Sequence, residues 1–549
     1  MEYECEEQEE EIVFKEECLN GPLALKVGNN EGLGSFFYKT MFENMGRIYQ
    51  VDSSTGKVET CGSIRERAIK IATELKHMNV TPEDIIMVCV RLHPEQATIL
   101  LSIFLLGAIV APIDPEMTLT EMKETLIKLR PKVIFCDLRN AAHIERSLME
   151  AKLYKQVHVI HIGGDPTSKK SLDSVLVKEP DISFQPTIIQ DSKKKICLII
   201  ATQGTTGSPK LVCHSDYALT YQIYLHRQII LETTSRLLSF FPLNWILQVV
   251  LCCLCYITSI VKVLPSSYSE RAIVRLIHDY RIDTLIISTK DCLKIVKHDS
   301  VNDFNLDCLK NIFIGGDIST PLEIVNIHRK INGARLIQFF ALTEMCGTVA
   351  SFVSESFDFM SPASTGKLMP GFKIKIGDLN TRVSQPPNTW GELTITGPSA
   401  MLKYFKGNIP SSIYMEKGYF RTGDLAEYDS QGHLYVLGKV TDLKETESTK
   451  FCLLEIEEIL MDHPLVSEVA VIADNKDIIA CVVKVEYSNL TVKSLEEFIE
   501  QNLAPQMRPT KIKILSEFPK TNIGKTRKII LEQNYLKVPI QRSIGNLSV

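Results

Sequence analysis

Hydrophobic positions follow two different patterns along the chain. In the first two thirds, continuous aliphatic runs alternate with amphipathic stretches, and the runs lie at 85–90, 132–137, 156–162, 196–202, 284–289 and 311–316. Short apolar runs separated by helical periodicity are typical of parallel strands that helices cover on both faces. We therefore expect an α/β fold whose large N-terminal body contains two doubly covered, mostly parallel sheets.

The pattern changes near residue 365. The stretches GKLMPGFKIKIGD, GELTITG and GHLYVLGK alternate polar and apolar positions between turns, which predicts a small β-barrel-like subdomain at about 365–437. A charged stretch follows, and then a compact tail with helices expected at 453–462 and 492–502 around two strands. The sequence thus predicts an N-terminal domain at 1–437 and a small, mobile α+β C-terminal domain at 438–549.

Composition narrows the class of protein. The 549 residues have a formal net charge of −5, so no global basic field indicates a nucleic-acid partner. Fifteen cysteines are scattered along the chain, and the acidic start shows no secretory signal pattern, which together indicate reduced thiols and an intracellular location. The close group Cys252, Cys253 and Cys255 lies in an apolar run, where buried thiols are expected rather than metal ligands.

Two apolar stretches, 97–111 and 245–261, resemble membrane spans at first sight. Polar residues and glycine interrupt both stretches, and neither reaches the roughly 20 apolar residues that a spanning helix needs. We expect two buried helices and no transmembrane segment. The chain ends in GNLSV, which is not a peroxisomal address of the SKL type.

The loop ATQGTTGSPK at 201–210 directly follows an aliphatic run. Its glycines permit a tight turn close to a ligand, its threonines supply hydroxyl donors and its lysine supplies a cation, a combination that suits an oligophosphate. The phosphate-binding candidates are Thr202, Gly204, Thr205, Thr206, Gly207 and Lys210. A polar turn without a ligand is the structural alternative.

Four further motifs follow in order: QFFALTEMCG, WGELTITGPSAMLKYF, GYFRTGDLAEYDSQGHLYVLGK and FPKTNIGKTRKIIL. With the phosphate loop they resemble the adenylate-forming superfamily nearly end to end, and the texture is most similar to insect luciferase-like acyl-CoA synthetases and 4-coumarate-CoA ligases. The resemblance implies ATP, Mg²⁺ and CoA as cofactors or co-substrates. It also implies a two-step reaction in which a carboxylic acid, expected to be fatty, becomes an acyl-adenylate and then a CoA ester.

The resemblance also implies individual roles. Lys525, Thr343 and Glu344 would be catalytic, with Glu344 as the ligand of Mg²⁺, and Asp424 would accept the ribose hydroxyls. The other nucleotide-binding candidates are Gly315, Gly316, Phe340, Ala341 and Lys439, and the candidates for the acid pocket are Asn244, Trp245, Phe339 and Cys346. The structural alternatives are a helix N-terminus for Glu344, a turn cap for Asp424 and a solvated lysine for Lys525.

Several positions depart from the family pattern. Phe339 replaces a glycine that is common in relatives and should narrow the acid tunnel, and Trp245 replaces a frequent histidine. Near the domain junction, Glu445 reverses the sign of a usual lysine and Ser448 replaces a usual glycine, which places CoA transfer in question. An acyl-CoA synthetase is therefore the leading hypothesis, beside a nucleotide-binding regulatory protein with little turnover and a luciferase-like monooxygenase. A peroxisomal location would rest on the resemblance alone.

Overall fold

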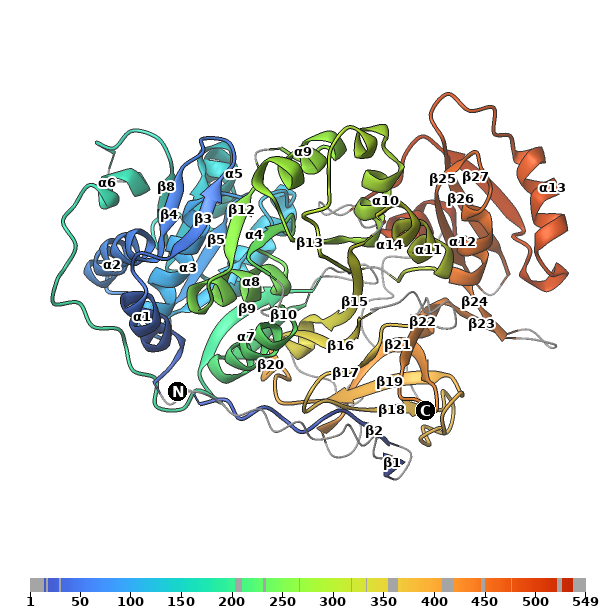
Figure 1. Cartoon of the computed structure of the whole chain (residues 1–549), viewed down its shortest axis with the longest axis horizontal. Helices are drawn as coiled ribbons and strands as arrows, with labels where there is room; N and C mark the ends of the chain where they lie inside the picture. Colours follow the sequence, from blue (N-terminus) through green and yellow to red (C-terminus); the bar gives the residue numbers. More distant parts are fainter. Residues whose placement is uncertain are drawn as a thin grey trace.

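The computed structural model describes most of the chain (Figure 1). The described residues are 14–15, 18–28, 31–168, 170–202, 210–230, 234–265, 267–316, 318–331, 333–353, 364–406, 418–445, 450–474, 476–520 and 526–536. In Figure 1 the N-terminal body fills the left and centre, and the C-terminal part lies on the right.

A seven-stranded sheet forms the first half of the body. Its strand order is β20(Lys403–Tyr404), β10(Leu211–Ser215), β9(Ile196–Ala201), β6(Ile109–Pro112), β5(Ile85–Cys89), β7(Val133–Asp137) and β8(His158–Ile162). The five strands from β9 to β8 are parallel, whereas β10 runs antiparallel to both β9 and β20. The aliphatic runs at 85–90, 132–137, 156–162 and 196–202 thus supply parallel strands, as the sequence predicts.

A nine-stranded sheet forms the second half. Its order is β17(Lys367–Leu368), β16(Gly347–Val353), β15(Arg335–Leu342), β14(Asn311–Gly315), β13(Thr284–Ser288), β11(Arg236–Ser239), β12(Val261–Leu264), β3(Ile48–Asp52) and β4(Val58–Thr60). The strands from β15 to β3 are parallel, and the antiparallel strands lie at the edges. The prediction of two mostly parallel sheets is therefore confirmed.

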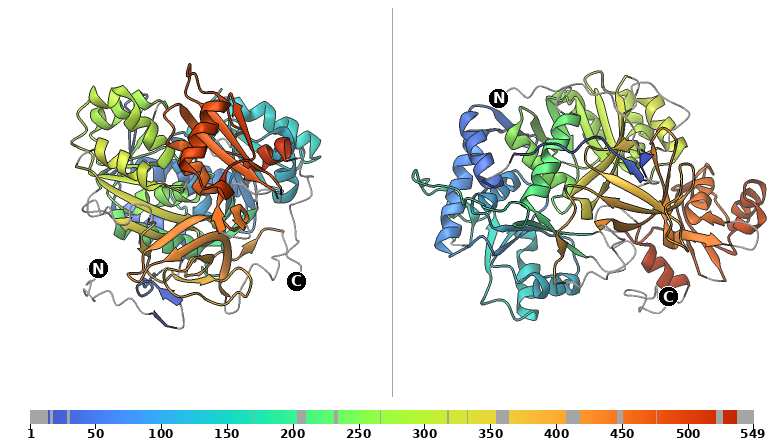
Figure 2. Two further views of the ribbon diagram at one scale, coloured as in Figure 1. Left: turned by 90° about the vertical axis from the view of Figure 1, so that its right-hand side faces the viewer. Right: turned by 90° about the horizontal axis from the view of Figure 1, so that it is seen from below.

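Helices pack between and around these sheets (Figure 2). They are α1(Leu33–Glu43), α2(Cys61–His77), α3(Glu95–Leu105), α4(Leu119–Leu129), α5(Leu138–Glu150), α6(Leu172–Leu176), α7(Asp216–Ile230), α8(Ile246–Ile257), α9(Glu270–Tyr280), α10(Thr289–Lys297) and α11(Pro321–Lys330). The stretch 245–261 forms α8, whereas the stretch 97–111 forms most of α3 and then enters β6, and residues of both helices join the two sheets in one hydrophobic core. Cys252, Cys253 and Cys255 are fully buried on α8. Within the described residues, no helix combines the length and apolar character needed to cross a membrane.

The region after residue 365 forms an antiparallel sheet. Its order is β1(Phe14–Lys15), β2(Cys18–Asn20), β18(Lys373–Gly377), β19(Gly391–Thr396), β21(Phe420–Tyr428) and β22(Leu434–Lys439). Over the part of the chain that is described, this sheet stays open, because its edge strands β1 and β22 do not pair with each other. The expected barrel-like subdomain is thus an open sheet, completed by two strands from the N-terminus.

The C-terminal part contains β23(Leu443–Glu445), β24(Lys450–Cys452), α12(Leu453–Met461), β25(Val466–Ala473), β26(Ile478–Lys484), α13(Val492–Asn502), β27(Lys511–Leu515) and α14(Lys528–Tyr535). Strands β25, β26 and β27 form a separate sheet with two small hydrophobic cores of its own. Gly438 and Lys439 still belong to β22, and a side chain at Gly438 would meet the Cys452 sulfur at 2.5 Å. The division at 437–438 stays a prediction, and the last strand of the body continues two residues beyond it.

Candidate functional site

A cleft of about 1180 Å³ lies between the body and the C-terminal part. The carboxyl ends of parallel strands β14 and β15 form one wall, which is where ligands bind in open α/β sheets. Helices α12 and α14 contribute to the opposite wall. The predicted site residues that line the cleft are Gly315, Gly316, Phe339, Phe340, Ala341, Asp424 and Lys439.

Asp424 is the buried carboxylate of this cleft, with only 4% of its surface exposed. It lies opposite Lys439 in the β21–β22 ladder, and its Oδ1 forms an ion pair of 2.5 Å with the Lys439 ammonium. Its Oδ2 is buried and accepts no hydrogen bond from any described residue. Leaving such an oxygen unpaired costs about 1–3 kcal/mol, so a ligand hydroxyl that donates to it would recover that energy.

Thr343 and Glu344 lie in a one-turn 3-10 helix, Thr343–Met345, between the antiparallel strands β15 and β16. Because the turn leads into a strand, Glu344 does not begin an α-helix. Gln222 of α7 fixes the turn by donating to the carbonyl oxygens of Met345 at 3.2 Å and Thr348 at 3.1 Å. Sequence reasoning missed Gln222, since nothing local marks an amide in a helix as the support of a turn more than 120 residues away.

Tyr404 links two of the predicted residues, and it too was missed. Its hydroxyl donates to Glu344 Oε1 at 3.0 Å, and the Lys210 ammonium lies 5.2 Å from the centroid of its ring. The Lys210 amide donates to Thr202 Oγ1 at 3.0 Å, which closes the base of the phosphate loop. The structure therefore brings the loop base and Glu344 to the same tyrosine.

Other predicted residues fall outside the described part of the chain. They are Gly204, Thr205, Thr206 and Gly207 of the phosphate loop, Ser448 near the junction and the catalytic candidate Lys525.

Two aromatic rings pack onto the glycines at the end of β14. A side chain at Gly315 would lie 2.8 Å from ring carbons of Phe339, and one at Gly316 would lie 2.9 Å from the ring of Trp245. Phe339 also borders a residual cavity of about 10 Å³, which His226 lines as well. The Phe339 side chain therefore lines both the large cleft and this small cavity.

The remaining pocket candidates lie elsewhere. Cys346 is fully buried, and burial raises the pKa of its thiol well above the ordinary value. Asn244 precedes Trp245 in the turn before α8 and is not among the residues that line the cleft.

Two buried histidines flank the Thr343 turn. His214 on β10 is fully buried, and burial lowers its pKa to about 4. His226 on α7 shares a hydrogen bond of 3.0 Å with Thr348 Oγ1, and burial lowers its pKa to about 4 as well. Both imidazoles are therefore neutral at pH 7.

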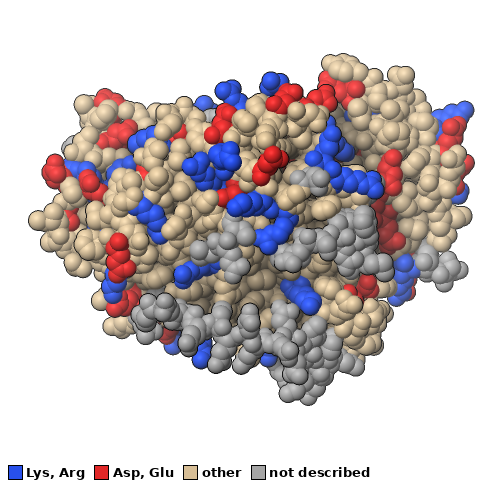
Figure 3. Space-filling view, in the orientation of Figure 1, with Lys and Arg blue, Asp and Glu red and all other residues tan. Residues whose placement is uncertain are grey.

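Charges of both signs adjoin the cleft. On the face shown in Figure 3, Lys and Arg side chains gather near the centre, and Asp and Glu side chains line the neighbouring edge of the C-terminal part. Glu458 of α12 lines the cleft, where burial and the nearby carboxylates of Glu323 and Glu455 raise its pKa to about 7. The sign reversal at Glu445 is offset, because its carboxylate pairs with Lys450 at 2.9 Å across the β23–β24 hairpin.

Comparison with known proteins agrees with this fold. The family described as AMP-binding enzyme matches residues 39–405, and its C-terminal domain family matches residues 455–525. The chain therefore belongs to the AMP-binding enzyme family, within the adenylate-forming superfamily, and the resemblance is confirmed.

Individual relatives are distant but nearly full-length. Luciferin 4-monooxygenase of Photuris pensylvanica is 26% identical over 491 residues, which cover 85% of this chain and 88% of that protein. Indoleacetate–CoA ligase of Aromatoleum aromaticum is 26% identical and covers 84% and 90%. Among solved structures, ATP-bound MatB from Rhodopseudomonas palustris shares the fold with a TM-score of 0.82, at 19% identity over 92% of this chain and 99% of that chain.

Proposed function

We propose that the protein uses ATP to activate a carboxylic acid and then transfers the acyl group to CoA. In the first step a carboxylate oxygen attacks the α-phosphorus and pyrophosphate leaves, which gives the acyl-adenylate. In the second step the CoA sulfur attacks the acyl carbon, AMP leaves and the thiol proton passes to solvent. The observation that carries the nucleotide site is the buried, unpaired Oδ2 of Asp424 in the cleft.

The residues present also fit a magnesium ion bound together with ATP. Mg²⁺ is usually held by one or two carboxylates and by substrate phosphates rather than by a cage of protein ligands. Glu344 offers a half-buried carboxylate beside the base of the phosphate loop. Across the described residues, no three or more His, Cys, Asp and Glu side chains form a metal cluster, so the phosphates would supply the other ligands. The bound ion would neutralise charge on the phosphates.

Other features support the finer parts of the proposal. The Glu445–Lys450 ion pair reduces the repulsion that a lone carboxylate would exert on the phosphates of CoA. The proposal that the substrate is a fatty acid rests on family resemblance. The Phe339 ring favours an acid whose acyl chain does not extend beyond β14. The fourteen described cysteines are all free, which supports an intracellular location.

Acid-dependent exchange of pyrophosphate into ATP tests the first step directly. By comparison with the loss of one transition-state donor, Lys525→Ala should lower the exchange rate about 100- to 1,000-fold. Lys511→Ala is the matched control, because Lys511 forms an ion pair of 2.6 Å with Asp477 away from the cleft lining and should leave exchange nearly unchanged. The absence of exchange with every acid of a broad panel would contradict the enzyme proposal.

The same preparation separates two alternatives. A regulatory nucleotide-binding protein would form at most one acyl-adenylate per chain and no CoA ester, an outcome that mass spectrometry detects. The relative named luciferin 4-monooxygenase makes light emission a second candidate. Light from a synthetic luciferyl-adenylate would favour that candidate, and rapid formation of a CoA ester would favour the synthetase.

A further inference from the structure

We propose that Tyr404 is a positioning residue that fixes the Glu344 carboxylate and the Lys210 ammonium relative to each other, so that both meet one metal-bound triphosphate. The inference rests on the proposed function and adds a residue to it. Tyr404 comes from β20, more than 50 residues after Glu344 and almost 200 after Lys210.

The segment 399–405 joins two distant parts of the site. At the Glu344 turn, Ser399 Oγ donates to the Met345 carbonyl oxygen at 2.7 Å, and the Met401 amide donates to the Glu344 carbonyl oxygen at 2.7 Å. The next residues extend the sheet beyond β10, because the Leu402 amide donates to the Cys213 carbonyl oxygen at 2.9 Å and the Phe405 amide donates to the Leu211 carbonyl oxygen at 2.8 Å. The backbone on both sides of Tyr404 is therefore held, on one side by the Glu344 turn and on the other by the strand that follows the phosphate loop.

The side chain of Tyr404 is only 6% exposed and lies between two charged groups. It contacts Glu344 through the hydroxyl at 3.0 Å and Lys210 through the ring face at 5.2 Å. A hydroxyl donor and a π face orient charges without cancelling them. Glu344 and Lys210, both described, form no ion pair with each other, so each keeps its charge for a ligand.

A tyrosine suits this place better than a charged residue. A lysine or arginine would neutralise Glu344 and repel Lys210, whereas a glutamate would do the reverse. The phenol satisfies one oxygen of the carboxylate and leaves the second oxygen for a cation. The arrangement thus keeps a negative and a positive group side by side, which matches the alternating charges of a metal–triphosphate complex.

Two substitutions separate the two contacts. Tyr404→Phe removes the hydroxyl and keeps the ring, so the Mn²⁺ concentration that half-saturates the ATP complex should rise about tenfold, while affinity for ATP in EDTA stays unchanged. Tyr404→Leu removes the ring as well and should also weaken metal-free ATP binding about threefold. Electron paramagnetic resonance of bound Mn²⁺ and calorimetric titration with ATP measure these constants without turnover.

Tyr435→Phe is the matched control, because Tyr435 donates to the Asp429 carboxylate at 3.2 Å outside the cleft. It should change neither constant. If Tyr404→Phe behaves like this control, or weakens metal-free and metal-bound ATP equally, the positioning role is wrong even when the wild type activates acids. If the wild type binds Mn·ATP with the expected response in Tyr404→Phe but activates no acid, the positioning role stands and the proposed reaction fails. Circular dichroism on each variant establishes that only folded protein is compared.

Discussion

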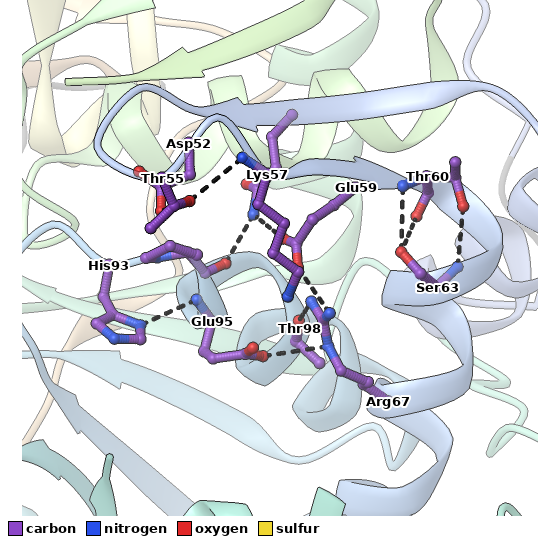
Figure 4. Close-up of polar contacts among 12 residues, drawn as sticks. Asp52, Thr55, Lys57, Glu59, Thr60, Ser63, Arg67, His93, Glu95 and Thr98 are labelled. Carbon is purple, nitrogen blue, oxygen red and sulfur yellow. Dashed lines mark hydrogen bonds and ion pairs between the residues drawn. The ribbon is translucent and has the colours of Figure 1, made fainter. Parts of the chain in front are cut away.

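Two buried carboxylates in this molecule have opposite surroundings. Glu59 on β4 is 2% exposed and receives three donors, of which Arg67 Nη1 at 2.6 Å and Lys57 Nζ at 3.0 Å are labelled in Figure 4. The third donor is Gln50 Nε2 at 2.5 Å. Burial alone would raise the pKa of Glu59, but the charge and hydrogen bonds of Arg67 hold it below its ordinary value. Asp424 is as deeply buried, yet it has one ion pair and one oxygen without a partner.

The difference separates a carboxylate that is fully paired within the protein from one that keeps an unpaired buried oxygen. Glu59 finds its hydrogen-bond donors within the protein. Its partner Arg67 also donates to Thr98 at 3.1 Å and so anchors α2 to α3 (Figure 4). Asp424 Oδ2 has no hydrogen-bond donor among the described residues, so a donor from a ligand could pair with it. A folded chain tolerates an unpaired buried oxygen where a ligand supplies the missing hydrogen bond. A missing hydrogen bond therefore indicates a binding site more directly than burial does.

The largest expected effect is on the stability of the protein and comes from Glu59, the carboxylate that is fully paired. Glu59→Ala leaves the Arg67 guanidinium without its main partner and should lower the free energy of unfolding by about 3–5 kcal/mol. Urea denaturation of the N-terminal body measures this loss. Lys57→Met removes an exposed partner and should cost less than about 1 kcal/mol. A similar loss in both variants would contradict the structural role of the Glu59–Arg67 pair.

The next largest effect is on ATP affinity and comes from Asp424, the carboxylate with an unpaired oxygen. Asp424→Asn should weaken ATP binding about 10- to 100-fold and change thermal stability little, because the bond that it removes is made to the ligand. Glu392 offers the matched control on neighbouring β19, where Arg421 at 2.5 Å and Arg382 at 2.7 Å already pair with it. Glu392→Gln should lower stability and leave ATP affinity unchanged. The reverse pattern would exchange the roles of the two carboxylates.

A third carboxylate extends the comparison to pH, with the smallest effect. The pKa of Glu458 is raised from 4.5 to about 7, because burial and like charges disfavour its ionised form. The contribution of Glu458 to the stability of the protein is therefore fully present below pH 4.5 and is lost as the pH rises through about 7. Glu458→Gln should raise the melting temperature at pH 8 and leave it unchanged at pH 4.5. Equal shifts at both pH values would show that ionisation is not the cause.

Much of the fold was predictable because strand formation is a local property. The continuous aliphatic runs marked parallel strands, and the interrupted runs marked the buried helices α3 and α8. The open six-stranded sheet was not predictable, because β2 and its partner β18 are about 350 residues apart in the sequence. The partner of Glu445 was missed for a related reason, since the Lys450 contact depends on the register of a short hairpin.

The sequence by itself determined the family and the chemical groups available to it, because motif order and residue type are written along the chain. Only the tertiary structure decided which of these groups find all their hydrogen-bond partners within the protein. Lys439 reaches one oxygen of Asp424 through strand pairing, and Tyr404 reaches Glu344 and Lys210 through a strand added beside β10. Hydrogen-bond satisfaction depends on partners that are distant in sequence, so it appears only when the chain has folded.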